Sequence, residues 1–206
     1  MSNAHPIGLV VFDLDDVLCA YDFAHRLRLL ARMTGLEATW IEKAIWSSGF
    51  DEQADQGRYT SQDYLDGFVA RLGVPLSRAQ WIKARTMAMT PDPEMLGIAR
   101  AVSHKTAVAM LTNNGPLLQE ALPGILPEIN DIFGDNAYFS SQFGCSKPNP
   151  DVFLRLLTQI GKQPMETLFI DDQADYIDGA KTAGLRVHHF QGATALRVEL
   201  TDLGLL

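Results

Sequence analysis

The sequence predicts an α/β fold, a Rossmann-like parallel sheet with helices on both faces, interrupted by an inserted all-helical cap. Three observations lead to this prediction. Short continuous apolar runs recur along the chain and stop at polar residues, as buried strands of a parallel sheet do. Helical patterns of about ten residues lie between these runs, which favours βαβ units. Residues 20–90 carry only helical patterns, and this stretch is too long for an ordinary crossover.

Five apolar runs are the expected strands of the core. The first is Gly8–Phe12, which stops at an acidic cluster. The others occupy 106–111, 137–139, 167–170 and 186–190. Helices are expected at Glu94–Val102, Val152–Ile160 and Ile177–Ala183, the first preceded by an Asp-Pro start signal and the other two followed by glycine. We therefore assign residues 1–19 and 91–206 to the core.

The long segment after the first strand has a different pattern, with four helical stretches and no strand-like run. The stretches are Asp22–Thr34, Glu37–Ser47, Ser61–Leu72 and Ser77–Met89. Ser77 and Gln80 are spaced as in a capping box, which marks the start of the last helix. We expect residues 20–90 to form the cap.

Charge and composition exclude several classes of function. The 206 residues include 17 Lys+Arg and 25 Asp+Glu, a net charge of −8, so the field of the protein repels nucleic-acid phosphates. No apolar run approaches the roughly 20 residues that span a bilayer, and Met1–Pro6 lacks the features of a secretory leader. Cys19 and Cys145 fit neither a disulfide framework nor a zinc site. We expect a cytoplasmic protein with no nucleic-acid or membrane partner; nothing in the sequence indicates an oligomeric state.

Polar residues cluster where the expected strands end. In an open parallel sheet the ligand site lies beyond the carboxyl ends of the strands, so these residues are the candidate site. They are Asp13, Asp15, Thr112, Asn113, Lys147, Asp171, Asp172 and Asp175.

The chemistry of this set points to a metal and to phosphoryl transfer. Neighbouring carboxylates repel one another unless a cation joins them, and all-oxygen ligands suit Mg²⁺. An ionised carboxylate such as Asp13 can act as a nucleophile and form an aspartyl phosphate. Lys147 and Thr112 can neutralise the oxygens of the transferred group. Asp15 can give a proton to the leaving oxygen and later take one from water.

Four segments of the chain match the motifs of a known family. The chain resembles the haloacid dehalogenase (HAD) superfamily of phosphohydrolases in four segments that occur in the family's order: Phe12–Leu18, Leu111–Asn113, Lys147–Phe153 and Phe169–Asp175. The helical block resembles that family's C1-type cap. Gln56–Thr60 and residues 171–180 are similar to the branch that contains α-glucose-1-phosphate phosphatases.

The resemblance implies a role for each motif residue. It makes Asp13 the nucleophile and Asp15 the general acid and base. It assigns phosphate binding to Thr112, Asn113 and Lys147, and Mg²⁺ binding to Asp13, the carbonyl of Asp15, and Asp171 or Asp172.

Two positions depart from the family pattern. Asp16 stands where members commonly have glycine, and Tyr176 stands where many relatives have an acidic residue. We expect Asp175 to take over the support of the metal ligands that this acidic residue provides.

The expected function is a Mg²⁺-dependent phosphatase that hydrolyses a small phosphorylated metabolite, with a sugar phosphate favoured. A phosphoglucomutase-type phosphotransferase shares all four motifs and stays open. A 2-haloacid dehalogenase is a further alternative and uses the same Asp nucleophile. By the resemblance, that branch of the family lacks the second acid of the first motif and needs no metal, so Asp15 argues against it. A phospho-acceptor or binding protein is the non-enzymatic alternative.

Overall fold

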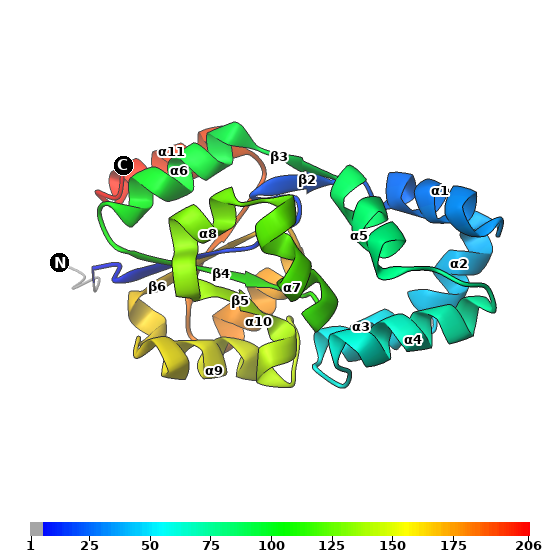
Figure 1. The fold of residues 1–206 in the computed structure, drawn as a ribbon. Helices are drawn as coiled ribbons and strands as arrows, with labels where there is room; N and C mark the ends of the chain where they lie inside the picture. The colour runs from blue at the N-terminus through cyan, green and yellow to red at the C-terminus, as the bar shows by residue number, and fades with distance from the viewer. Residues whose placement is uncertain (1–5) are drawn as a thin grey trace.

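Five parallel strands form the central sheet of the computed structural model, which describes residues 6–206. The order across the sheet is β5-β4-β1-β6-β7, so the first strand of the chain lies in the middle (Figure 1). The strands are β1 (Leu9–Phe12), β4 (Ala107–Thr112), β5 (Ala137–Phe139), β6 (Thr167–Asp171) and β7 (Arg186–His189). All five agree with the predicted apolar runs.

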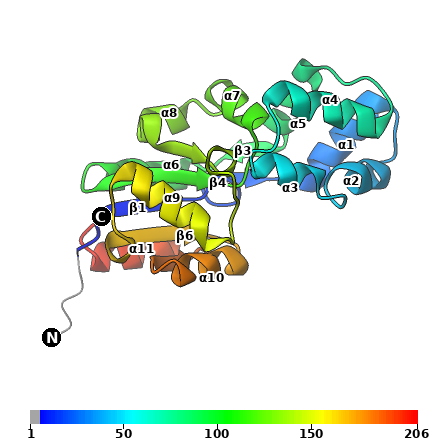
Figure 2. The ribbon, with the colours of Figure 1, turned by 90° about the horizontal axis from the view of Figure 1, so that it is seen from below.

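Helices cover both faces of this sheet, because alternate side chains of each strand point to opposite sides. Val10 and Phe12 belong to one apolar cluster, and Leu9 and Val11 belong to the other. Figure 2 looks onto the face that carries α9 and α10. The core helices are α6 (Pro93–Ser103), α7 (Pro116–Ile125), α8 (Glu128–Phe133), α9 (Pro150–Ile160), α10 (Ala174–Thr182) and α11 (Ala193–Asp202).

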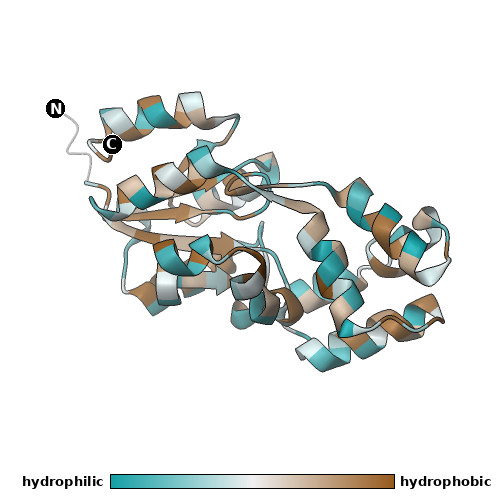
Figure 3. Ribbon diagram, turned by 45° about the horizontal axis from the view of Figure 1, so that its top comes forward, coloured by the Kyte–Doolittle hydropathy of each residue, from teal (hydrophilic) through white to brown (hydrophobic). Residues whose placement is uncertain are grey.

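A separate group of helices lies beyond one end of the sheet, at the right of Figure 1. These are α1 (Phe23–Thr34), α2 (Ala38–Ile45), α3 (Phe50–Asp55), α4 (Ser61–Leu72) and α5 (Arg78–Met87). The buried apolar residues of these helices belong to one hydrophobic cluster, and brown marks the apolar residues along the ribbon in Figure 3. The Ser77–Gln80 capping box at the start of α5 is confirmed, with hydrogen bonds in both directions.

The helical group joins the core through two short antiparallel strands, β2 (Cys19–Tyr21) and β3 (Met89–Pro91). The prediction that residues 20–90 contain no strand is therefore wrong at both ends of the segment. Each of these two strands buries only its first residue, so neither produces an apolar run, whereas the three-residue β5 buries two residues and was indicated by one. The predicted domain boundaries fall inside this ribbon and stay predictions; residues 1–5 of the first core segment lie outside the described residues.

Several further elements had no clear sequence signal. Helices α3 and α8 span six residues each, and α7 contains Pro123, a residue that normally interrupts helices. Helix α11 has only a weak separation of polar and apolar sides. Three single turns of 3₁₀ helix occupy Gly134–Asn136, Ser140–Phe143 and Pro164–Glu166. Within residues 6–206, each helix is too short or too polar to cross a membrane.

Candidate active site

The predicted site residues come together at the carboxyl ends of the central strands. Asp13 directly follows β1, Thr112 ends β4 and Asp171 ends β6. Because these strands are parallel and adjacent, their ends reach the same edge of the sheet. A pocket opens there, lined by Asp13, Asp15, Asp16, Thr112, Asn113, Asp172, Gln173 and Tyr176.

Lys147 lies between two buried carboxylates. Its Nζ is 2.8 Å from Oδ1 of Asp13 and 2.7 Å from Oδ2 of Asp171, and it donates to the Leu111 carbonyl at 3.2 Å. Burial alone would lower the pKa of Lys147, but Asp13 and Asp171 outweigh it and raise the pKa. The ammonium group therefore stays charged inside the protein.

Burial acts on the pKa of Asp13 in the opposite direction to its effect on Lys147. The Asp13 side chain is buried, and burial raises its pKa well above the usual range; Lys147 opposes this effect and Asp171 adds to it. One ammonium group thus faces two carboxylates at close range. The excess negative charge favours the binding of a further cation at this place.

Three carboxylates are arranged as metal ligands. One oxygen each from Asp13, Asp171 and Asp172 can be chosen so that all lie within 4.8 Å of one another. Asp171 is further held by the Gln173 amide, which donates to Oδ1 at 2.8 Å, whereas half-buried Asp172 lines the pocket itself. Burial raises the pKa of Asp172, while a hydrogen bond from Gln173 Nε2 at 2.5 Å opposes the rise. An all-oxygen set of this kind fits Mg²⁺.

The segment after β4 positions Lys147. Asn113 Nδ2 donates to the Lys147 carbonyl at 2.8 Å, and Asn113 Oδ1 accepts from the Lys147 amide at 2.9 Å. Both ends of this side chain are thus engaged with the backbone of the lysine, and phosphate binding by Asn113 stays a prediction. Thr112 is buried, and its hydroxyl accepts from Asn114 Nδ2 at 2.7 Å.

Asp15 makes contacts that the sequence did not indicate. Arg85 of α5 donates from Nη2 to both carboxylate oxygens, at 2.8 Å and 2.6 Å. Asn114 Nδ2 lies 3.3 Å from Oδ2 of the same side chain. Asn114 was recognisable only as a turn residue, and Arg85 lies 70 positions from Asp15 along the chain, so no local pattern could connect them.

The two departures from the family pattern have different outcomes. Asp16 has a φ of +60°, a conformation that favours glycine, which explains why glycine suits this position. Its carboxylate accepts from the Tyr21 amide at 2.9 Å. Asp175 is exposed in the first turn of α10, and its carboxylate makes no hydrogen bond within the described part of the chain. The structure does not bring it to the carboxylate cluster, and its supporting role stays a prediction.

Helix α3 provides a second wall, which faces the core across an adjoining pocket. The pocket is lined by Trp46, Asp51, Glu52, Asp55, Asn113, Ser146, Lys147, Pro148 and Tyr176. Burial, the largest influence, raises the pKa of Asp55, and nearby Asp51 raises it further. Tyr64 donates to Asp51 at 2.5 Å. These acidic residues could not be recognised from the sequence, because the six-residue helix α3 that carries them has little periodicity.

The chain is similar in sequence to known proteins over most of its length. The family model of the haloacid dehalogenase-like hydrolases matches residues 7–184. Phosphatase MT3486 of Mycobacterium tuberculosis is 26% identical over 190 residues, which cover 88% of this chain and 86% of that protein. D-ribitol-5-phosphate phosphatase of Bacteroides thetaiotaomicron is 23% identical over 198 residues, 93% of this chain and 96% of the relative.

Solved structures share the fold. The HAD family enzyme bt-2542 of Bacteroides thetaiotaomicron, in complex with magnesium and inorganic phosphate, superposes with a TM-score of 0.80 at 22% identity. The match covers 92% of this chain and 98% of that one.

Proposed function

Since the chain belongs to the haloacid dehalogenase-like hydrolase family, we propose that it is a Mg²⁺-dependent phosphatase that hydrolyses a small phosphorylated metabolite through an aspartyl-phosphate intermediate. The observation that carries this proposal is the joint placement of Asp13 and Asp15 in one pocket with Asp172 and Thr112. Lys147 lies directly behind Asp13. A nucleophile, a proton carrier and groups that bind anions therefore meet at one point.

The first step transfers the phosphoryl group to the protein. Lys147 engages Oδ1 of Asp13, which leaves Oδ2 as the oxygen that attacks phosphorus. A bond forms between this oxygen and phosphorus while the ester P–O bond breaks, and the leaving oxygen takes a proton from Asp15. Lys147 and Thr112 bind the oxygens of the transferred group.

The second step releases the phosphate. Asp15 takes a proton from a water molecule that attacks phosphorus, and the bond between phosphorus and Asp13 breaks. Inorganic phosphate leaves, and both carboxyl groups return to their starting states. Asp13, Asp171, Asp172 and the carbonyl of Asp15 would hold Mg²⁺, which when bound neutralises charge on the phosphoryl oxygens.

A sugar or polyol phosphate is the favoured substrate. The wall formed by Asp51, Glu52 and Asp55 offers carboxylate oxygens that accept hydrogen bonds from hydroxyl groups. Trp46 adds an apolar surface beside them. D-ribitol-5-phosphate, named as the substrate of one relative, has this character.

The test is a phosphate-release screen with purified protein and Mg²⁺. The panel contains sugar and polyol phosphates, phosphoglycolate, nucleotides and amino-acid phosphates, each also tested with Asp13→Asn. We expect release of inorganic phosphate by the native sequence that EDTA abolishes. No release from any member of the panel would refute the proposal.

Three further measurements on the same purified protein separate the alternatives. A mutase would produce an isomerised sugar phosphate in place of inorganic phosphate. A dehalogenase would release chloride from 2-chloropropionate in the presence of EDTA. A phospho-acceptor would keep a stable phosphoryl group on Asp13 after treatment with acetyl phosphate, without turnover.

A further inference from the structure

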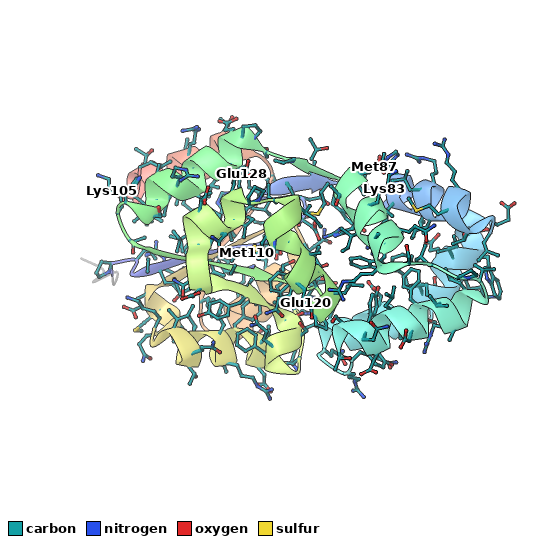
Figure 4. All side chains as sticks on the ribbon, in the orientation of Figure 1. Lys83, Met87, Lys105, Met110, Glu120 and Glu128 are labelled. Carbon is teal, nitrogen blue, oxygen red and sulfur yellow. The ribbon has the colours of Figure 1, made fainter. Side chains whose placement is uncertain are left out.

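Two arginines of the helical group form ion pairs with core carboxylates, and their surroundings differ. Arg78, at the start of α5, pairs with Glu120 of α7, and both side chains are substantially exposed. Figure 4 labels Glu120 on α7, on the side of the core that faces the helical group. Arg85, in the last turn of α5, is 1% exposed and pairs with Asp15 in the pocket.

Arg85 is the one charged residue of α5 that is buried, next to the buried Trp81 and Ala84 of the same helix. Lys83 and Met87, both labelled in Figure 4, precede and follow Arg85 by two positions and are exposed. A buried guanidinium is costly unless it is paired, because it loses its hydration. Within residues 6–206, Asp15 is the only hydrogen-bond partner of the Arg85 guanidinium, and Nε of this group has none.

The guanidinium is also held from its other side. Its central carbon lies 4.0 Å from the centre of the Tyr21 ring, within the range of a cation–π contact. Tyr21 belongs to β2, and its hydroxyl accepts from Arg26 Nη1 at 3.0 Å. Arg85 is therefore placed between the strand that leads into the helical group and the carboxylate of the pocket.

We propose that Arg85 is a positioning residue, which holds the Asp15 carboxyl group in the orientation for proton transfer to the leaving oxygen and from water. This role rests on the proposed function, in which Asp15 carries the proton in both steps. A carboxyl group with a proton on one oxygen still accepts from Nη2 through the other, so the contact can persist through the cycle. Small displacements of a proton carrier are expensive, and about 1 Å can cost 10²-fold in rate.

The leaving group distinguishes this role from a purely structural one. An alkyl phosphate needs a proton on its leaving oxygen, whereas p-nitrophenolate departs without one. The value of kcat/KM reports the transfer of the phosphoryl group to Asp13. Loss of proton delivery should therefore lower kcat/KM for the alkyl ester and leave it nearly unchanged for the p-nitrophenyl ester.

The experiment compares Arg85→Gln with the native protein on glycerol phosphate and p-nitrophenyl phosphate. We expect kcat/KM to fall about 10- to 100-fold for glycerol phosphate and less than about threefold for p-nitrophenyl phosphate. Asp15→Asn should show the same selectivity, and adding Arg85→Gln to it should cause no further loss. Arg85→Lys, which keeps the charge but loses the reach to both oxygens, should fall between.

Arg78→Gln is the matched control, because it removes an ion pair between the same two regions without touching the pocket. It should leave both kcat/KM values unchanged. Equal losses on the two esters, additive losses in the Asp15→Asn background, or the same selectivity in Arg78→Gln would each overturn the role of Arg85. If Arg85→Gln does not fold, the ratio of the two esters for Arg85→Lys decides.

Failure of the proposed function would look different. A native protein that hydrolyses neither ester, nor any other phosphate of the screen, refutes the phosphatase activity and with it this role. A native protein that hydrolyses both, with a uniform loss in Arg85→Gln, refutes the role of Arg85 alone.

Discussion

The sheet core and the helical group contribute to the pocket in different ways. The core supplies reactive groups from the ends of β1, β4 and β6, and its buried charges are matched at short range, as Lys147 is with Asp13 and Asp171. The helical group supplies Arg85 and the acidic side chains of α3, and several of its buried donors, on Arg26 and Trp81, have no partner within the described chain.

This difference indicates a division of labour. Groups that carry out chemistry must be held rigidly, and adjacent strand ends of a buried sheet do this for any substrate. Groups that face the variable part of a substrate need a surface that can differ between relatives, and a loop-connected set of helices provides one. In the function that we propose, the core carries out the reaction, while the helical group faces the substrate and orients Asp15.

The most severe test of this comparison is Asp13→Asn. It replaces the proposed nucleophile with an amide of the same size, and we expect kcat to fall by about 10⁴-fold or more. Steady-state kinetics on the best substrate of the screen measure the loss. An active variant would show that the chemistry does not depend on this strand end.

Asp172→Asn separates the two carboxylates that follow β6. Asp172 lines the pocket, whereas Asp171 is tied to Lys147 and the Gln173 amide. We expect the Mg²⁺ concentration for half-maximal activity to rise about 10- to 100-fold, with little change in melting temperature. Asp171→Asn should raise the Mg²⁺ requirement as well and should also lower the melting temperature, because Lys147 loses a buried partner; the reverse pattern would exchange their roles.

Gly57→Ala tests the contact between the helical group and the core at Gly57 and Ser141, which we call the seam. Gly57 has a φ of +73°, and an added Cβ would lie 2.1 Å from the Ser141 carbonyl oxygen of the core. We expect a loss of about 3 kcal/mol in the free energy of unfolding, measured by urea titration. Gly35→Ala is the control, since Gly35 has a φ of +74° with open space around it, and it should lose only about 1 kcal/mol. Equal losses would show that the seam does not constrain this glycine.

Glu120→Gln should have the smallest effect. Its pair with Arg78 is exposed, so we expect a loss of about 0.5 kcal/mol and unchanged activity. Hydrogen bonds from Ser61 and Arg78 lower the pKa of Glu120, so the pair stabilises the fold at neutral pH, and this contribution is lost as the pH falls through the acidic range. Thermal melts of both proteins between neutral and acidic pH check this; a large difference at neutral pH would contradict it.

Much of the core was predictable from the sequence, for a physical reason. A strand that is buried on both faces consists mostly of apolar residues, so β1 and β6 are recognisable as continuous apolar runs. The polar residues that follow them lie at the edge of a parallel sheet where ligands bind. The same logic placed Asp13, Thr112, Lys147 and Asp171 near one another. It could not find α3 or α11, because a six-residue helix and a weakly amphipathic one have little periodicity.

The tertiary structure alone decided the contacts between residues that lie far apart in the chain. The pairing of Asn113 with the backbone of Lys147, the contact of Arg85 with Asp15, and the exposure of Asp175 each depend on how separate elements are oriented in space. Periodicity and spacing describe one element at a time. The sequence by itself thus determined the five strands of the central sheet, the helical insertion and the polar groups at the strand ends, while packing decided which partner each group meets.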